Sequence, residues 1–337
     1  MIIYPELKNG DAIAVTAPSS GVPVELHSLL YQACERLEKK GYRIQLGDTA
    51  GKQEKAKSAP AAVRAAELND LLLNPALGLI LPPWGGELLI EILEYVDFKK
   101  IRPKWVLGYS DVSLLLLAIT LNTGIATAHG TNLVDLRGDF SDSTTAMWEK
   151  VLSAGRGNTI TQTSSLLYQK KWNHEDPSPC VFHLTEATEW KVAGSENAKI
   201  KGRLLGGCLD IIRHIAGTPF ADIDRFREKH IGHEPILWYF ENCEMNCTEL
   251  RRTLLQLKLT GWFKGISGIM FGRSNANQPV EGYEAADLYL ELTQELGVPV
   301  IYDIDCGHMP PQMTLINGAW AEVEVSGGKG SVVQKFV

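Results

Sequence analysis

The sequence lacks the features that define several large classes of protein. It has no stripe of lysine and arginine, and its net charge is −7 at pH 7, so we expect no nucleic-acid polymer as a partner. Its longest apolar runs, such as residues 113–121, are too short to span a bilayer, and no polybasic cluster suits an anionic membrane. Residues 1–6 show no basic segment followed by an apolar one. We therefore expect a cytoplasmic protein that does not bind a membrane.

Cofactor-binding motifs are also scarce. The six cysteines among 337 residues form no disulfide-rich pattern, so reduced thiols are expected. Cys243 and Cys247 lie near His230 and His233, but this spacing matches no standard zinc finger. No phosphate-binding loop of the G-x-x-x-x-G-K-[ST] type occurs, and no G-x-G-x-x-G follows the first expected strand. The sequence therefore predicts a protein without a metal or another cofactor.

The first half of the chain alternates strand-like and helix-like segments. Strands are expected at residues 11–17, 42–46, 77–81 and 105–109, and helices at residues 24–40, 61–73, 88–95 and 112–121. This order predicts an α/β domain with a doubly wound parallel sheet and helices on both faces. Sites in such sheets lie at the carboxyl ends of the strands, where Gly85, Gly86 and Ser110 fall.

The pattern changes after the first domain, which we place at residues 1–155. Residues 156–200 are rich in Ser, Thr, Asn, Asp and Pro, and they predict a linker with a hairpin-like excursion. Residues 201–337 predict a second, smaller domain of mixed α/β type with a β-rich C-terminal part. Its expected helices are 208–216, 248–260 and 283–296, and its expected strands are 236–240, 265–271, 298–302, 313–316 and 319–325.

Ser110 is the strongest candidate for a nucleophile. It lies in Gly108-Tyr109-Ser110-Asp111, where an expected strand meets a strongly apolar expected helix. The helix N-terminus behind it offers free N–H groups and a partial positive charge, which suit an oxyanion product. The alternative is that Ser110 or Asp111 only caps the helix, as Ser and Asp often do.

A serine nucleophile needs a base and a carboxylate that orients the base. His308 is the preferred base because it follows an expected strand in a loop braced by two prolines. Glu241 is the preferred acid because it directly follows the apolar strand 236–240. Glu244, Asp303 and Asp305 remain rivals for the acid, and His129 could line the same cleft.

Two other classes of protein remain open at this point. One is a metallohydrolase that uses His308 with Asp303 and Asp305, and the other is a protein that only binds a ligand in its cleft. For the serine mechanism, Gly85-Gly86 would let a backbone N–H approach the substrate. Gly86 and Asp111 would then supply the two N–H groups of an oxyanion hole.

These segments together resemble the serine peptidase family of LD-carboxypeptidases and microcin C self-immunity proteins. The resemblance implies a flavodoxin-like N-terminal domain, a C-terminal domain with mixed β structure, and a homodimer. It also implies a triad of Ser110, Glu241 and His308, with oxyanion donors at Gly86 and Asp111. The segments that carry it are residues 7–18, 85–86, 103–111, 206–209, 217–218, 236–241 and 305–308.

Two features favour the microcin-immunity branch of this family. Gly86 is followed by residues 87–93 without an arginine, and the middle excursion contains Glu189-Trp190. This branch implies that a serine carboxypeptidase cleaves a peptidyl- or aminoacyl-nucleotide. The alternative substrate is a murein tetrapeptide that loses its terminal D-alanine. Trp190 is a candidate for stacking on a flat substrate group, and its alternative role is a buried hairpin tryptophan.

Overall fold

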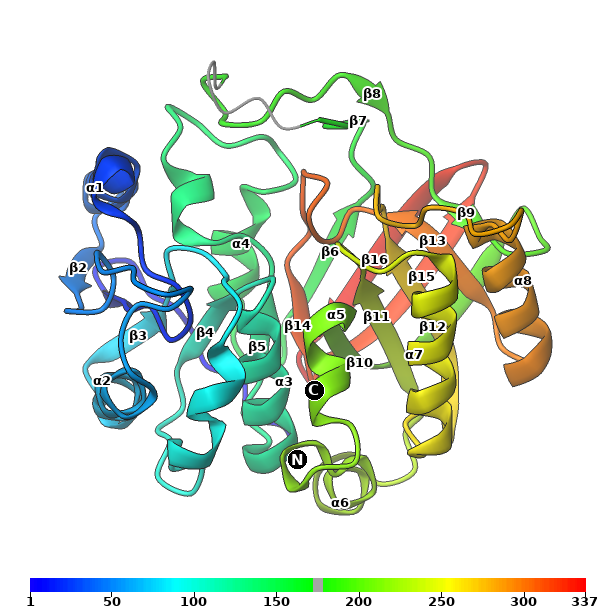
Figure 1. The fold of residues 1–337 in the computed structure, drawn as a ribbon, viewed down its shortest axis with the longest axis horizontal. Coiled ribbons are helices and arrows are strands. Elements are labelled where there is room, and N and C mark those ends of the chain that lie inside the picture. The colour runs from blue at the N-terminus through cyan, green and yellow to red at the C-terminus, as the bar shows by residue number, and fades with distance from the viewer. Residues whose placement is uncertain (172–177) are drawn as a thin grey trace.

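Two β-sheets lie side by side, with helices between and around them (Figure 1). The computed structural model describes residues 1–171 and 178–337, so part of the linker predicted at residues 156–200 lies outside the described residues. The longer helices are α1 (His27–Lys39), α2 (Ala61–Leu73), α3 (Val112–Thr123), α7 (Cys247–Leu259) and α8 (Ala285–Leu296). The shorter ones are α4 (Met147–Leu152), α5 (Leu209–Ile212), α6 (Ile223–Phe226), η1 (Val24–Leu26), η2 (Leu89–Tyr95), η3 (Leu133–Leu136), η4 (Arg213–Ile215), η5 (Pro219–Ala221) and η6 (Arg227–Ile231).

The first sheet confirms the predicted fold class. Its order in the described part of the chain is β2-β1-β3-β4-β5-β14. The neighbours from β2 to β5 pair in parallel, and β14 pairs antiparallel with β5. The order 2-1-3-4-5 is that of a flavodoxin-like doubly wound sheet. The strands are β1 (Ala12–Val15), β2 (Arg43–Leu46), β3 (Leu77–Ile80), β4 (Trp105–Gly108), β5 (Thr127–His129) and β14 (Leu315–Asn317).

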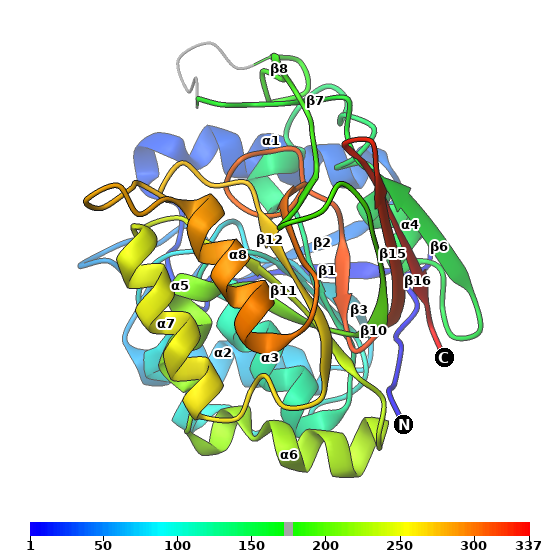
Figure 2. The ribbon, with the colours of Figure 1, turned by 90° about the vertical axis from the view of Figure 1, so that its right-hand side faces the viewer.

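The second sheet is mixed, as predicted. Within the described residues its order is β6-β16-β15-β10-β11-β12-β13-β9, with parallel pairing from β10 to β13 and antiparallel pairing toward both edges. Figure 2 shows α7 and α8 on one side of this sheet. The strands are β6 (Thr159–Thr163), β9 (Lys191–Val192), β10 (Ala198–Cys208), β11 (Ile236–Glu241), β12 (Ile266–Gly272), β13 (Val300–Ile304), β15 (Trp320–Ser326) and β16 (Lys329–Lys335). A separate two-stranded ribbon joins β7 (Leu167–Tyr168) to β8 (Glu186–Ala187).

Strand pairing crosses the predicted domain boundaries. β6 and β9 come from the segment predicted as a linker, and both join the second sheet, which therefore has more described strands than the first. β14 comes from the C-terminal part of the chain and joins the first sheet. The division into residues 1–155, 156–200 and 201–337 stays a prediction, and the two sheets share segments across it.

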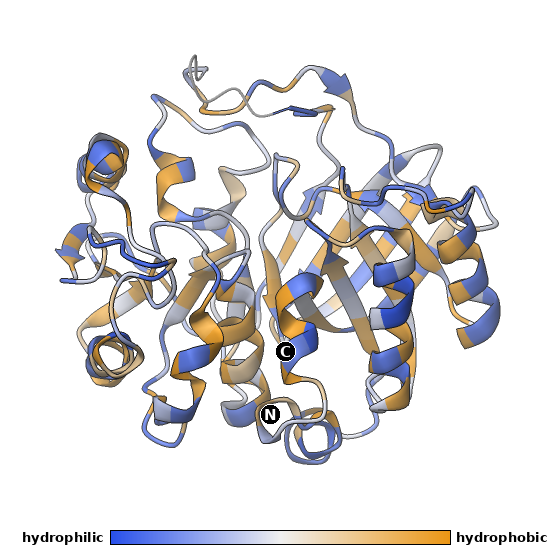
Figure 3. Cartoon of the chain, viewed as in Figure 1, coloured by the Kyte–Doolittle hydropathy of each residue, from blue (hydrophilic) through white to orange (hydrophobic). Residues whose placement is uncertain are grey.

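Helix α3 joins the two sheets. Its residues from Val112 to Leu121 are all buried, and it contacts β4 and β5 of the first sheet and β10 of the second. A helix that is apolar on every side is stable only when it is covered on every side. Figure 3 shows α3 as largely hydrophobic, whereas α7 and α8 carry both hydrophobic and hydrophilic residues. Ser110 precedes this helix, so it lies where the two sheets meet.

Some elements differ from the sequence-based expectation. Residues 89–95 form a 3-10 helix rather than an α-helix, and the helix expected at residues 208–216 is a short α5 followed by η4. The long strand β10 was not expected because glycines usually weaken strands. Here a Cβ on Gly206 would lie 1.7 Å from the Tyr239 carbonyl oxygen, so the glycine permits close approach of β10 to β11. None of the helices in the described part of the chain has the length and hydropathy that a membrane-spanning helix requires.

Candidate active site

Ser110 occupies a strained turn between β4 and α3. Its φ of +62° lies in the left-handed region, which non-glycine residues rarely adopt. Such a turn lifts a serine side chain out of the end of a sheet, as in the nucleophile turn of α/β-hydrolases. A Cβ on Gly85 would lie 2.5 Å from the Ser110 Cβ and 2.7 Å from its Oγ. Only glycine therefore allows the Gly85 backbone to lie so close to this side chain.

The structure brings three predicted residues together. His308 Nε2 lies 3.1 Å from Ser110 Oγ, and His308 Nδ1 lies 2.7 Å from Glu241 Oε2. Both distances fall in the hydrogen-bond range that a nucleophile, its base and the orienting acid require. Ser110 comes from the first sheet, whereas Glu241 ends β11 and His308 follows β13 of the second. The group therefore forms only when the two sheets meet.

A glycine also permits the contact between the acid and the histidine loop. Gly307 has a φ of +95°, and a Cβ there would lie 2.5 Å from both the Cβ and the Oε2 of Glu241. The glycine thus lets the loop pass directly over the end of β11, which brings the ring of His308 to the Glu241 carboxylate. The rival acids do not occupy this position: Glu244 is exposed, and Asp303 pairs with Lys191 Nζ at 2.9 Å.

Burial and charge act in opposite directions on the pair of Glu241 and His308. Burial opposes the charged form of Glu241, but the adjacent His308 outweighs it and lowers the pKa of this carboxyl group below its ordinary value. Burial also opposes the charged form of His308, but Glu241 and, after it, Cys243 together outweigh it and raise the pKa of the imidazole well above its ordinary value. With Nδ1–H donating to Glu241, the neutral ring presents Nε2 as an acceptor to Ser110.

The backbone amides of Gly86 and Asp111 are the predicted oxyanion donors. Gly86 has a φ of +144°, and a Cβ there would lie 2.3 Å from Ser19 Oγ. Among the hydrogen bonds of the described residues, the backbone N–H groups of Gly86 and Asp111 donate none. Both amides are thus available to a substrate oxygen in this arrangement.

The side chain of Asp111 does not cap helix α3, which overturns that alternative. Its carboxylate instead accepts hydrogen bonds from Ser19 Oγ and from the backbone N–H of Leu89 at 2.8 Å. Burial raises the pKa of this carboxyl group, while these hydrogen bonds lower it. The carboxylate thereby connects the nucleophile turn to the loop after β1 and to the segment after Gly86. Sequence reasoning missed this role because Ser19 lies far away along the chain.

An open pocket of about 310 Å³ adjoins the three residues. Ser110, His308 and both loop glycines line it, and so do Trp84, Tyr109 and Asn132, which sequence reasoning missed. The Tyr109 ring lies edge-on to His308 with centroids 5.1 Å apart, and Asn132 Oδ1 accepts from the Tyr109 N–H at 3.3 Å. The signal that could have identified Trp84 is its place directly before Gly85.

Two predicted substrate-binding residues lie away from this pocket. Trp190 is 1% exposed, and its Nε1–H donates to Asp305 Oδ2 at 2.9 Å, which matches the alternative of a buried tryptophan. His129 is fully buried, and burial lowers its pKa to about 4. Its ring lies edge-on to the rings of Tyr109 and Tyr239. Neither side chain lines the pocket in this conformation.

The acids of the metallohydrolase alternative are paired elsewhere. Asp305 is fully buried and accepts from Arg273 Nη2 at 2.8 Å, the Ser165 N–H at 2.9 Å and Trp190. Within the described residues, the metal-ligating side chains that gather around His308 are Cys208 and Cys243, not these acids. The contact between His308 and Ser110 also argues against a protein that only binds a ligand, because that alternative predicted a wide separation.

Comparison with known proteins assigns the chain to a family. The models of the N-terminal and C-terminal domains of LD-carboxypeptidases match residues 13–130 and 201–323. The chain is 25% identical over 340 residues to the microcin C7 self-immunity protein MccF of Escherichia coli, covering 97% of this chain and 94% of the relative. It is 28% identical over 328 residues to the probable murein peptide carboxypeptidase of Bacillus subtilis, covering 95% and 91%.

A solved structure agrees with this assignment. MccF in complex with glutamyl sulfamoyl guanosine matches with a TM-score of 0.83 at 21% identity, over 100% of each chain. This likeness concerns the fold, and the two domain models carry the family assignment. The chain belongs to the LD-carboxypeptidase family and is an enzyme of the carboxypeptidase class.

Proposed function

We propose that this protein is a serine carboxypeptidase that cleaves an amide bond near the C-terminus of a small peptide or peptide conjugate. The observation that carries the proposal is the continuous series of hydrogen bonds from Ser110 through His308 to Glu241. Ser110 and His308 line the pocket. This order of nucleophile, base and orienting acid is what acyl transfer by a serine requires.

Each of the three residues has one role in the proposed reaction. His308 Nε2 accepts the proton of Ser110 as Oγ attacks the amide carbonyl carbon, and it then gives that proton to the leaving amine. Glu241 holds the ring in position and stabilises the imidazolium that forms between these steps. A water molecule then attacks the acyl-enzyme with His308 as base, which releases the acid product and restores Ser110.

The backbone amides of Gly86 and Asp111 are the proposed donors to the oxyanion. Gly86 lines the pocket with Ser110 and Asp111 follows Ser110 in the chain, and neither amide donates a hydrogen bond to another group of the described residues. Amides fixed in place before the reaction stabilise developing charge without reorganisation, and one such donor typically contributes about 3–4 kcal/mol to transition-state binding.

A peptidyl- or aminoacyl-nucleotide is the proposed substrate class. MccF, which aligns with nearly the whole chain, has been solved with glutamyl sulfamoyl guanosine, an aminoacyl-nucleotide analogue. The partly exposed ring of Trp84 lines the pocket and offers a flat surface for a substrate group, a role that the buried Trp190 does not offer here. The second candidate, a murein tetrapeptide, is supported by the murein peptide carboxypeptidase relative.

One assay tests both candidates. The enzyme is incubated separately with an aminoacyl sulfamoyl adenylate and with a murein tetrapeptide, and the products are identified by mass spectrometry. We expect release of the free amino acid from the first compound by the wild-type chain and no release by Ser110→Ala. If the enzyme releases D-alanine from the tetrapeptide and leaves the adenylate intact, the murein tetrapeptide is the substrate and the nucleotide proposal fails. Equal turnover by wild type and Ser110→Ala would refute the mechanism.

We also propose a cytoplasmic location and a homodimer. All six cysteines are free thiols, which suits a reducing compartment.

The proposal of a homodimer follows from the family resemblance, and light scattering of the purified chain tests it. A mass of one chain, 37.2 kDa, across micromolar concentrations would contradict the dimer.

A further inference from the structure

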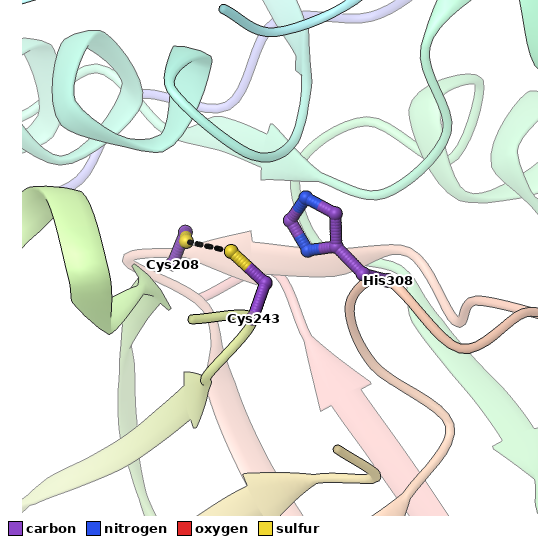
Figure 4. Close-up of side chains that lie close together, drawn as sticks. All are labelled: Cys208, Cys243 and His308. Carbon is purple, nitrogen blue, oxygen red and sulfur yellow. Dashed lines mark hydrogen bonds between the residues drawn. The ribbon is translucent and has the colours of Figure 1, made fainter. Parts of the chain in front are cut away.

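Two cysteines outside the proposed mechanism lie beside its histidine. Cys208 ends β10 and Cys243 follows the end of β11, and these strands are parallel neighbours in which Cys208 pairs in register with Glu241. Figure 4 shows both thiols pointing into the space next to the His308 ring. The three potential ligand atoms, two Sγ and one ring nitrogen, lie within 4.8 Å of one another.

The distance between the two sulfurs matches a metal site better than a disulfide. Cys208 Sγ and Cys243 Sγ are 3.9 Å apart. With Zn–S bonds of about 2.3 Å and tetrahedral angles, two sulfurs on one zinc lie about 3.8 Å apart. A disulfide needs a separation of about 2.05 Å, which would require the two strand ends to move together. The thiols are therefore placed to share an ion without movement of the sheet.

The surroundings of the two thiols fix their positions. Asp210 Oδ2 accepts from the Cys243 N–H at 2.8 Å and from Cys208 Sγ at 3.6 Å, and Asp210 Oδ1 accepts from the N–H groups of Glu244 and Met245 at 3.2 Å. This carboxylate is buried and orients the turn that carries Cys243. Groups behind a metal site that orient its ligands in this way contribute to metal affinity.

We propose that Cys208, Cys243 and His308 bind a soft divalent cation such as Zn²⁺, and that the bound ion reversibly inhibits the enzyme. Two thiols and one imidazole are a zinc donor set that leaves a fourth position for water. Each ion that binds replaces the two thiol protons, which pass to solvent. The ring nitrogen that binds the ion loses either its contact with Glu241 or its capacity to accept the Ser110 proton. The inhibition rests on the proposed function, whereas the binding does not.

Binding is tested first, without reference to activity. The reduced wild-type chain is titrated with Co²⁺, whose thiolate complexes absorb in the near ultraviolet, and Zn²⁺ is then added to displace it. We expect one site per chain with this absorption, and affinity at least about tenfold weaker in Cys208→Ser and in Cys243→Ser. Cys180→Ser removes a partly exposed thiol elsewhere and should bind like wild type. The proposed metal site would be refuted if wild type shows no thiolate absorption, or if both site variants retain it in full.

Inhibition is tested second, with the substrate that the assay above identifies. Zn²⁺ should abolish hydrolysis by wild type and by Cys180→Ser, and EDTA should restore it. Cys208→Ser and Cys243→Ser, which retain Ser110, His308 and Glu241, should stay active at the same Zn²⁺ concentration. Equal inhibition of all four proteins, or activation of wild type by Zn²⁺, would overturn the inhibitory site. If no protein hydrolyses either substrate without metal, the proposed function fails while the Co²⁺ result still decides the binding site.

Discussion

The carboxylate of Asp111 accepts a hydrogen bond from the backbone N–H of Leu89 at 2.8 Å and thereby fixes the segment after Gly86 to the nucleophile turn. The same carboxylate accepts from Ser19 Oγ, so one buried side chain holds together three segments that surround Ser110. The two proposed oxyanion donors are therefore positioned relative to each other by Asp111 itself.

This relationship predicts that Asp111→Ala damages both stability and catalysis. The change leaves the Leu89 N–H and Ser19 Oγ without their acceptor, which costs about 1–3 kcal/mol of unfolding free energy. We expect kcat to fall by about 100-fold, since misplacement of a catalytic group by about 1 Å has this effect. Urea denaturation and steady-state kinetics measure the two effects. Asp111→Asn keeps an acceptor oxygen and should recover part of both, and a fully active Asp111→Ala would contradict the role.

The interaction of Glu241 with His308 predicts the pH dependence of the enzyme. His308 must be neutral to accept the Ser110 proton, and its pKa is raised well above 6.5, so kcat/KM should rise with pH through a midpoint above 6.5. Glu241→Gln removes the charge that raises this pKa most and should move the midpoint to lower pH. The same variant should lower kcat on the order of 10³–10⁴-fold because the ring loses its orienting carboxylate. An unchanged midpoint in Glu241→Gln would show that Glu241 does not control His308.

The close contact of Gly85 with Ser110 predicts a large effect of a single methyl group. In Gly85→Ala the new Cβ would lie 2.5 Å from the Ser110 Cβ, so the serine must move. We expect kcat to fall about 100-fold or more. Gly157→Ala is the control: its φ is +88°, but nothing lies within 4 Å of the new Cβ. It should lose about 1–2 kcal/mol of stability and no activity. Similar kcat values for the two variants would argue against a positioned nucleophile.

The buried position of Trp190 predicts a structural effect of its replacement. Trp190→Phe removes the hydrogen bond to Asp305, a residue of the loop before His308. The Asp305 carboxylate also accepts hydrogen bonds from Arg273 and Ser165. The loss should cost about 1–3 kcal/mol of unfolding free energy with little change in KM. Thermal unfolding and the KM for an aminoacyl sulfamoyl adenylate separate the two roles. A several-fold rise in KM at unchanged stability would restore the stacking role expected from the sequence.

The sequence identified the three candidate residues that the structure brings together, because each has a recognisable place on an element. Ser110, Glu241 and His308 each come at or just after the carboxyl end of an apolar strand, and such ends gather at one edge of a sheet. The parallel, doubly wound sheet was predictable because alternating strands and helices permit few topologies, whereas its flavodoxin-like order was implied by the family resemblance.

Other features depend on contacts between distant segments. The side chain of Asp111 looked like a helix cap, but its partners are Ser19 and Leu89, which only the folded sheet brings near. Trp190 lies in a polar segment, yet its ring is buried just before strand β9, which pairs with β13. Cys208 was expected to begin a helix, and as the end of β10 it lies beside Cys243 instead. Local pattern carries no information on such pairings.

The most direct test of the central claim is covalent labelling of Ser110. A phosphonate reagent that reacts with activated serines is incubated with the wild-type chain, with Ser110→Ala and with His308→Gln, and the labelled peptides are identified by mass spectrometry. The account predicts one label, on Ser110, in the wild-type chain, no label in Ser110→Ala, and labelling on the order of 10³-fold slower in His308→Gln. A wild-type chain that stays unlabelled, or that is labelled at another residue with equal rate in all three proteins, would contradict the assignment of Ser110 as the nucleophile.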